Sequence, residues 1–208
     1  MYEKYVKRWL GFLLALTGLP IFAVVYVIIA PLIYFEDKGP VFYSGERIGK
    51  NGRIYRMHKF RSMKVNAPDI RLADGSTYNG EDDPRVTKIG KLLRETSLDE
   101  IPQLLNILKG EMSFIGPRPD PPDWLSKYPD ELKVFLSVRP GITGYSQAYY
   151  RNSDDSYEKI VHDAYYAKHL SFLFDMKILF KTIQTVCKHE NLYRKDDNKT
   201  WEEKVKKW

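Results

Sequence analysis

The feature that most limits how this chain can fold is a stretch of 27 residues, Trp9 to Phe35, that contains no charged side chain. As one helix it would be roughly 40 Å long, which is enough to cross a bilayer. Its length, and the lack of a small-residue cleavage site after it, argue against a cleaved signal peptide. Soluble domains rarely bury so long an apolar run, so we expect a membrane segment rather than a core helix.

Pro20 lies inside this stretch and lacks the N–H that a helix interior needs, so it should break or kink the helix. The halves, residues 9–19 and 21–35, would be roughly 16 and 22 Å long, and neither crosses a hydrocarbon core of about 30 Å comfortably. The hydroxyl of Thr17 could bind a carbonyl that is freed at the break. A helix–break–helix is therefore expected.

Basic residues flank the stretch on both sides. They are Lys4, Lys7 and Arg8 before it, and Arg47, Lys50, Arg53, Arg56, Lys59 and Arg61 after it. Cytoplasmic flanks of membrane segments carry such charges, so both ends should lie in the cytoplasm. We therefore expect residues 1–37 to form a re-entrant hairpin that enters one leaflet and returns, with a single tilted span as the alternative.

The charge of the whole chain points to a polyanionic partner. The chain carries 33 Lys and Arg against 27 Asp and Glu, a net charge of +6. Residues 1–66 hold 11 of these cations and 4 of the acids, so the basic excess lies in the first third. An anionic membrane face or a nucleic acid would fit. Nucleic acid is the weaker interpretation, because the cations adjoin an apolar run and no recognised binding motif is present.

Composition and cysteine content exclude several classes of protein. With 43% hydrophobic and 29% charged residues, the chain is neither disordered nor a polytopic membrane protein. Its single cysteine, Cys187, excludes a disulfide framework and a cysteine-rich zinc site. No phosphate-binding glycine loop, metal-ligand histidine spacing or serine nucleophile elbow is found.

The remaining chain predicts a cytosolic globular domain, residues 38–188, and a loosely held charged tail, residues 189–208. The fold class is mainly α with a small β element. Strands are expected at 38–46 and 52–60, a loop at 64–83, an extended connector at 116–122 and a turn-rich loop at 138–144. Helices are expected at 84–95 (with Asp83 as N-cap), 99–109, 123–136, 154–168 and 172–188. The last helix has an apolar face that could pack on the core or lie in the membrane interface.

The adjacent acids Asp99 and Glu100 are the centre of the most informative segment, SLDEIPQLLNILKGEMSFIGPRP (97–119). A purely structural interpretation is a capping box from Ser97 to Glu100. That start would place Pro102 where an N–H is needed, whereas with Asp99 as N-cap the proline is harmless. A helix start also binds phosphate, so a carboxylate, a metal ion and a phosphate could share this place.

Several cations near this segment in the sequence suit an anionic substrate. They are Lys59, Arg61, Arg85, Arg94, Arg118 and Arg139. Arg118 is the strongest candidate, because Pro117 and Pro119 restrict its backbone and orient its guanidinium for a phosphate.

Four segments, in this order, resemble the bacterial sugar transferases. They are KGPVFYSGERIG, YRMHKFRSM, DPRVTKIGKLLRETSLDEIPQLLNILKGEMSFIGPRP and VRPGITGYSQ. The resemblance covers about residues 5–188 and is closest to the small monotopic polyprenol-phosphate phosphoglycosyl transferases without an added N-terminal domain. It implies a re-entrant helix at the cytoplasmic face of the bacterial inner membrane. It also implies transfer of a sugar-1-phosphate from a UDP-sugar to undecaprenyl phosphate with Mg²⁺, releasing UMP, as the first membrane step of glycan or exopolysaccharide synthesis.

The resemblance also assigns residues to roles. Asp99 matches the nucleophile and Glu100 its partner, with both expected near the metal ion. Lys59 and Arg94 match basic residues of the active site, and Arg118 matches the arginine of Pro-Arg-Pro. Two acids of the late helices match with less defined roles, and they are Asp163 and Asp175.

The chain departs from the family pattern at Gly11, at Leu19 before Pro20, and at Tyr149-Tyr150 before Arg151. The stretch from Gly11 to Pro20 also looks about one helical turn short. This departure and the first two affect the depth and angle of the hairpin. The tyrosine pair could alter sugar recognition.

Anionic inner-leaflet lipids, a second copy of the chain and downstream glycosyltransferases are the further partners expected. The alternative function is a membrane-anchored lipid-binding or scaffold protein without catalysis, in which Asp99 and Glu100 only cap a helix.

Overall fold

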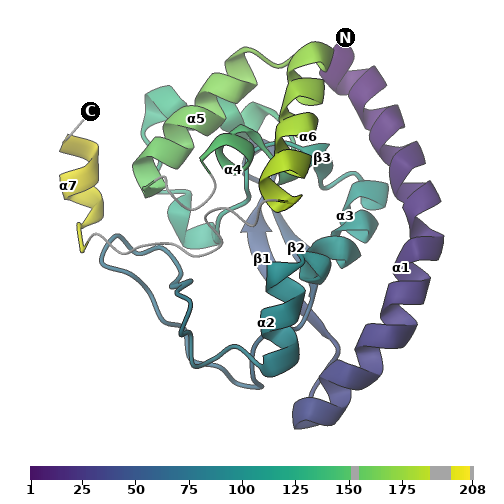
Figure 1. Ribbon diagram of the computed structural model, residues 1–208. Helices are drawn as coiled ribbons and strands as arrows, with labels where there is room; N and C mark the ends of the chain where they lie inside the picture. The colour runs from purple at the N-terminus through teal and green to yellow at the C-terminus, as the bar shows by residue number, and fades with distance from the viewer. Residues whose placement is uncertain (151–154, 188–197, 207–208) are drawn as a thin grey trace.

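The computed structural model describes residues 1–150, 155–187 and 198–206. Helices predominate among them, and the β structure is limited to two small two-stranded sheets, as the sequence predicts. The helices are α1 (Lys7–Asp37), α2 (Lys88–Glu95), α3 (Leu104–Lys109), α4 (Tyr145–Tyr149), α5 (Ser156–Lys168), α6 (Phe172–Cys187) and α7 (Trp201–Lys206). The strands are β1 (Phe42–Ile48), β2 (Ile54–Phe60), β3 (Ser113–Ile115) and β4 (Gly141–Thr143). Figure 1 shows α1 along one side of the molecule, with the other elements gathered beside it.

The N-terminal apolar stretch forms one continuous helix. α1 runs from Lys7 to Asp37 with Pro20 inside it, so the predicted interruption at Pro20 is wrong. The helix is bowed instead, with its convex side away from the domain (Figure 1). Pro20 still leaves the carbonyl of Leu16 without its usual N–H partner. The Thr17 hydroxyl donates to the carbonyl of Leu14, at 3.0 Å, and not to that of Leu16.

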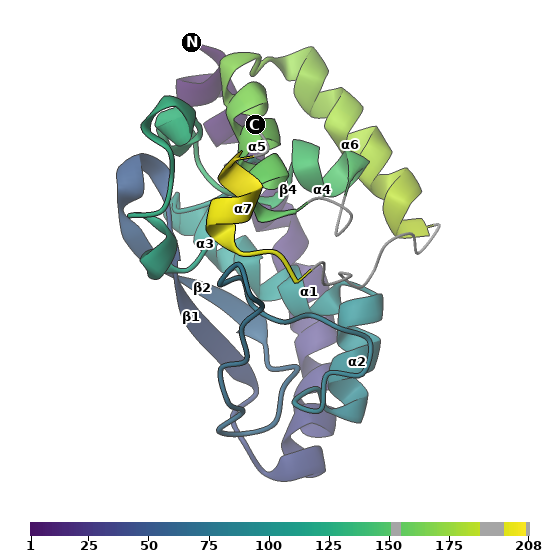
Figure 2. The ribbon, with the colours of Figure 1, turned by 90° about the vertical axis from the view of Figure 1, so that its left-hand side faces the viewer.

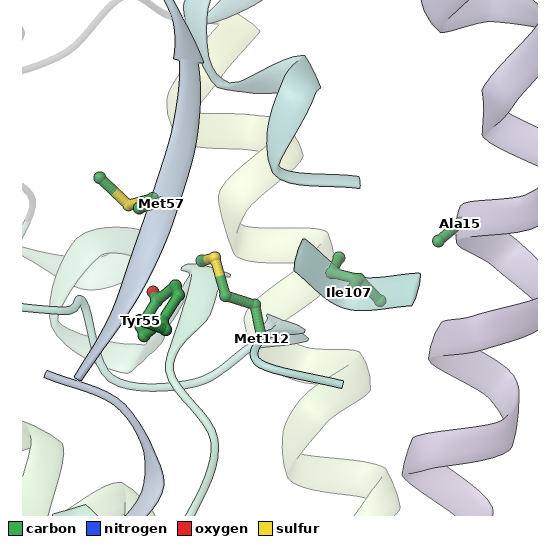
Figure 3. Packing of buried hydrophobic residues seen from close by; sticks show 5 residues of the cluster. All are labelled: Ala15, Tyr55, Met57, Ile107 and Met112. Carbon is green, nitrogen blue, oxygen red and sulfur yellow. The ribbon is translucent and has the colours of Figure 1, made fainter. Parts of the chain in front are cut away.

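Three small residues, Gly11, Ala15 and Gly18, bring the inner face of α1 against α3. A Cβ atom at Gly18 would lie 3.0 Å from Leu104, and one at Gly11 would lie 3.8 Å from Ile107. Such small side chains let two helices approach closely. Figure 3 shows the core cluster at this contact, which comprises Ala15, Tyr55, Met57, Ile107 and Met112. The inner face of α1 is therefore held against α3 on the N-terminal side of Pro20.

The opposite face of α1 exposes large apolar side chains. The exposed fractions are 63% for Trp9, 70% for Val27 and 67% for Phe35. Soluble proteins rarely expose an apolar surface of this extent. Among the described helices, α1 is the one long and apolar enough to cross a membrane. This surface is compatible with a membrane anchor.

Ion pairs tie both ends of α1 to the same domain. Near the first turn, Lys7 Nζ lies 2.8 Å from Asp175 Oδ2. At the last turn, Arg61 donates to both carboxylate oxygens of Asp37, at 2.5 and 2.6 Å. The Glu36 carboxylate also accepts hydrogen bonds from the first two N–H groups of α2. Lys7 and Arg61, two of the predicted flanking cations, are therefore used inside the protein and not at a lipid surface.

The two predicted strands form an antiparallel hairpin, and the helix after the polar loop begins later than predicted. β1 pairs with β2 over their whole length. α2 starts at Lys88 with Thr87 as its N-cap, and the Thr87 hydroxyl accepts the Gly90 N–H at 2.9 Å. Asp83, the predicted cap, pairs with Arg85 instead.

β3 and β4 form a parallel strand pair that the sequence does not predict, and β4 lies within the loop expected at 138–144. β3 and β4 align Ser113 with Gly141 and Ile115 with Thr143. A Cβ atom at Gly144 would lie 2.1 Å from the carbonyl oxygen of Gly116, so only glycine permits this approach. The carboxyl ends of the two strands therefore lie side by side, which places the Pro-Arg-Pro segment next to the start of α4.

The late helices agree with the prediction, but the segments before and after them differ. α5 and α6 confirm the helices expected at 154–168 and 172–188. Residues 123–136, predicted to be helical, contain two short 3₁₀ segments, Pro122–Trp124 and Asp130–Ser137. α6 buries Ile178 fully and exposes 70% of Phe180, so one face packs on the core and the other stays open. Within the predicted tail, 189–197 and 207–208 lie outside the described residues, and Trp201–Lys206 form α7.

Candidate active site

Asp99 and Glu100 lie on a 3₁₀ turn (Leu98–Gln103) directly after α2. The chain reverses through Ser97, which has a left-handed backbone with φ of 58°, an unusual conformation for a residue other than glycine. The Ser97 N–H donates to the Arg94 carbonyl, and the Glu100 N–H donates to the Ser97 carbonyl. Ser97 occupies the N-cap position without a side-chain hydrogen bond, so neither predicted cap is formed. This reversal keeps the end of α2 beside the two carboxylates.

Lys59, the penultimate residue of β2, joins the two carboxylates. Its Nζ lies 2.6 Å from Glu100 Oε1 and 3.6 Å from Asp99 Oδ2. The three side chains are largely buried but keep 10–15% of their surface exposed. Within the described chain, Asp99 accepts no hydrogen bond at its carboxylate, whereas Glu100 is held closely. Asp99 therefore has oxygen lone pairs available at an accessible position.

Arg118 lies on the other side of Glu100, where the sequence predicts it. Its Nη1 is 3.3 Å from Glu100 Oε1, and 46% of its side chain is exposed. Lys159 of α5 donates to the Arg118 carbonyl at 3.1 Å and also pairs with Asp120. The arginine backbone is therefore fixed from α5, while its guanidinium faces the opening of the site.

Arg94 approaches the carboxylates from the last turn of α2. Its Nε donates to Ser62 Oγ at 3.0 Å, and its Nη1 lies 3.4 Å from Asn79 Oδ1. Its charge favours the ionised form of Asp99. Asn79 and Ser62 could not be predicted as site residues from the sequence, because a neutral polar residue in a loop gives no signal until its long-range partner is known.

The pKa values of the two carboxyl groups are shifted in opposite directions. Burial and the neighbouring charge of Glu100 raise the pKa of Asp99, although Lys59 opposes this shift. Burial also penalises the charge of Glu100, but Lys59 and Arg118 together hold the pKa of Glu100 well below its usual range. The ionised form is therefore favoured at Glu100 and disfavoured at Asp99. Perturbed carboxyl pairs of this kind are typical of catalytic sites.

Three of the predicted phosphate ligands have other partners. Arg61 binds Asp37 at the end of α1, as described above. Arg85 is 4% exposed and binds Asp83 and the carbonyls of Pro68 and Tyr78, so it anchors the polar loop. Arg139 donates to the Gly110 carbonyl and to Glu3, near the start of α1. The sequence shows that these residues are cations but not which carbonyls and acids satisfy them.

The two late acids are also placed. Asp163 is 1% exposed and lies 3.8 Å from Lys159, which links it indirectly to Arg118. Asp175 is 2% exposed and accepts hydrogen bonds from Tyr2 and Tyr166 besides its ion pair with the first turn of α1. Asp175 is therefore a structural anchor and not a ligand at the Asp99–Glu100 pair.

The chain is similar to several known proteins over most of its length. The chain is 39% identical over 188 residues to a UDP-N-acetylgalactosamine-undecaprenyl-phosphate N-acetylgalactosaminephosphotransferase of Aeromonas hydrophila. The matched region covers 88% of this chain and 44% of that protein. It is 43% identical to the galactosyl transferase CpsE of Streptococcus agalactiae, over 86% of this chain and 42% of that protein. It is 38% identical to the exopolysaccharide production protein ExoY of Sinorhizobium fredii, over 90% of this chain and 88% of that protein.

The chain thus spans less than half the length of the first two relatives and most of the third. A family model described as bacterial sugar transferase matches residues 2–189. This range includes α1, the β1–β2 hairpin, the two carboxylates, Arg118 and the parallel strand pair. The extent of this match, together with relatives that are about 40% identical, shows that the chain belongs to the bacterial sugar transferase family.

Proposed function

We propose that this protein transfers a sugar-1-phosphate from a UDP-sugar to undecaprenyl phosphate, giving undecaprenyl-diphosphate-sugar and UMP. The observation that carries the proposal is the placement of Lys59 between two carboxylates of different character, with Arg118 and Arg94 beside them. Two anions surrounded by three cations suit a reaction in which a carboxylate must approach a negatively charged diphosphate. The names of the relatives supply the class of sugar donor and the lipid acceptor.

Asp99 acts as the nucleophile in this proposal. Its carboxylate oxygen attacks the β-phosphorus of the UDP-sugar, the bond from that phosphorus to the bridging oxygen breaks, and UMP leaves with the bonding electrons. A phosphate oxygen of undecaprenyl phosphate then attacks the same phosphorus and releases the Asp99 carboxylate. The under-coordinated state of Asp99 supports this role, because a carboxylate with several hydrogen bonds would be a weaker nucleophile.

Glu100 and the cations would position and neutralise the diphosphate. Glu100 holds Lys59 and Arg118 through its Oε1 atom, which leaves their remaining N–H groups for phosphate oxygens. Arg118, half-exposed, can reach a ligand at the opening of the site.

The carboxylate pair also fits Mg²⁺. The described residues contain no group of three or more His, Cys, Asp or Glu side chains that could bind a metal ion by themselves. Mg²⁺ is commonly held by one or two carboxylates together with the phosphates of a substrate, so Asp99 and Glu100 would be its protein ligands. When bound, the ion would offset the negative charge of the diphosphate.

We further propose that the protein is monotopic, with α1 entering the cytoplasmic leaflet of the inner membrane and both its ends at the same surface. The ion pairs at the two ends of α1 support this, because they connect both ends to one domain. A helix that crossed the bilayer upright would place those two anchors on opposite sides. The outer apolar face of α1 would contact lipid, and the site would receive one substrate from the cytosol and one from the leaflet.

The central experiment is an exchange assay that needs no lipid acceptor. Purified protein in detergent, given Mg²⁺, radiolabelled UMP and a UDP-sugar, is expected to move label into the UDP-sugar pool. Exchange occurs because the first step is reversible and complete without the acceptor. UDP-N-acetylgalactosamine and UDP-galactose are the first donors to test, since relatives carry these sugars in their names.

Addition of undecaprenyl phosphate should then convert the exchange into net UMP release with sugar-phosphate on the lipid. A protein that only binds lipid or acts as a scaffold would give neither exchange nor release with any UDP-sugar. Release that strictly requires the acceptor, with no exchange in its absence, would contradict the covalent route while keeping the overall reaction.

Membrane topology is tested by labelling engineered cysteines at the two ends of α1. Lys4→Cys and Lys38→Cys, in a background where Cys187 is replaced, both place an exposed thiol outside the apolar stretch. In sealed inverted vesicles, whose cytoplasmic face is outward, an impermeant maleimide should label both positions to the same extent. Labelling of Lys38→Cys alone would indicate a span and overturn the monotopic arrangement.

A further inference from the structure

The C-terminal helix α7 lies beyond the family match, which ends at residue 189, yet it is docked on the domain. The Trp201 ring packs edge-on against Trp124 with their centroids 5.3 Å apart, and it also contacts Tyr157 at 5.8 Å. In Figures 1 and 2, α7 lies beside the loop that connects β2 to α2. The aromatic contacts therefore join a segment outside the family match to the 3₁₀ segment at Trp124 and to α5, beside the polar loop 64–83.

A buried ion pair makes this contact specific. Lys204 of α7 and Asp74 of the loop are each 2% exposed, and Lys204 Nζ lies 2.8 Å from Asp74 Oδ2. Ser156, at the start of α5, donates to the same carboxylate oxygen at 2.5 Å, and Ser76 donates to the other oxygen. Burial alone would raise the pKa of Asp74, but these hydrogen bonds hold it well below its usual range. Lysine is rarely so buried unless it is paired, so the pair fixes one position for α7.

The loop transmits its position to the active site. Residues 70–78 fold back on themselves, because the Leu72 N–H donates to the Ser76 carbonyl and the Tyr78 N–H donates to the Ile70 carbonyl. Asp74 is at the tip of this small hairpin. The next residue after Tyr78 is Asn79, whose amide oxygen lies 3.4 Å from Arg94 Nη1. A constraint at the tip therefore reaches the arginine that stands beside Asp99.

We propose that α7 is a latch for the loop 64–83, and that Lys204 is a positioning residue that acts through Asp74 and Asn79 on Arg94. The loop has no extensive sheet or helix of its own, so its position depends on side-chain anchors at its tip and at Arg85 near its end. Removal of Lys204 takes away the charged partner of Asp74 while the Ser156 hydrogen bond remains, so the hairpin is held more loosely and the Asn79 contact with Arg94 is weakened. The part of this proposal that concerns catalysis rests on the function proposed above.

Hydrogen exchange of the full-length protein in detergent tests the latch without reference to activity. Lys204→Met removes the charge and keeps an apolar stem, and it should increase amide exchange in residues 70–79 by about tenfold. The matched control is Lys206→Met, which makes the same change on an exposed side chain of the same helix. Lys204→Arg should restore protection, since a guanidinium also reaches Asp74.

A loop exchange rate in Lys204→Met within twofold of the unmodified protein, or an equal increase in Lys206→Met, would overturn the latch. If Lys204→Met exchanges amide hydrogens faster throughout the chain, the variant has lost its fold as a whole, and Asp74→Asn is used to test the latch instead. It is expected to raise exchange in both the loop and α7 while β1 and β2 stay protected.

Kinetics separate a positioning role from a merely structural one. With UMP release as the readout, Lys204→Met should raise KM for the UDP-sugar about fivefold or more, because Arg94 no longer meets the phosphates in a fixed orientation. A purely structural loss lowers the amount of active enzyme and leaves KM unchanged, which would overturn the positioning role. Absence of UMP release from the unmodified protein would overturn the proposed function, while hydrogen exchange would still judge the latch.

Discussion

Replacement of Asp99 by asparagine is expected to abolish both UMP exchange and UMP release, by at least about 10³-fold, because the amide cannot form the phosphoryl bond. The protein should still fold and bind membranes. Its stability is expected to stay equal or rise, since burial and Glu100 raise the pKa of Asp99, so the folded state holds this carboxylate at a disadvantage above its ordinary pKa. A neutral amide removes that disadvantage. Such a trade of stability for chemistry is typical of active sites.

The matched control for this variant is Asp123→Asn, which makes the same chemical change at a half-exposed acid that pairs with Arg71. It should leave exchange and release unchanged. Thermal unfolding in detergent and flotation with liposomes establish that both variants are folded and membrane-bound. Exchange in Asp99→Asn within tenfold of the unmodified protein would remove Asp99 from the role of nucleophile and would leave Glu100 as the candidate.

Replacement of Asp175 by asparagine is expected to lower stability by about 3–5 kcal/mol, because Lys7 stays buried without its counter-charge. For a chain of this length, that corresponds to a fall in Tm of roughly 6–20 °C. The amide oxygen can accept only one of the two hydrogen bonds that Tyr2 and Tyr166 donate to Asp175, so the loss reports on the ion pair together with one of these hydrogen bonds. Differential scanning fluorimetry in detergent measures it.

Asp130→Asn is the control for the ion pair, since Asp130 pairs with Lys133 on the surface and its side chain is 92% exposed. Exposed pairs contribute little, so its Tm should change by no more than about 2 °C. Below the melting temperature of Asp175→Asn, UMP release per folded molecule should be retained, which distinguishes an anchor from a catalytic acid. Loss of release without loss of stability would reverse this assignment.

Local sequence signals predict much of the fold, and partners distant in sequence decide the rest. The hairpin of β1 and β2 and the helices α5 and α6 follow from short-range patterns, and the structure has all of them. The strand pair of Ser113–Ile115 and Gly141–Thr143 could not be read in this way. Each strand is only three residues long, and its pairing depends on the close approach of Gly116 and Gly144 rather than on an alternating pattern.

The candidate site shows the same division. Lys59, Arg94 and Arg118, which the sequence and the family resemblance name as site residues, lie beside Asp99 and Glu100. Arg61, Arg85 and Arg139 instead bind acids or carbonyls that only the folded chain brings near. The sequence does not show which group a basic side chain binds. That partner decides whether the side chain is free to bind a phosphate or is a buried structural anchor.

In the proposed membrane arrangement, the two anchored ends of α1 determine how the protein meets bilayers of different thickness. A free transmembrane helix responds to a mismatch between its apolar length and the hydrocarbon core by tilting. α1 cannot tilt independently, because Lys7 and Asp37 hold its ends to one rigid body and the small residues between them seat it on α3. The lipids must therefore adjust to the protein. The depth at which the headgroup of the proposed lipid substrate would meet Asp99 is consequently set by the fold and not by the membrane.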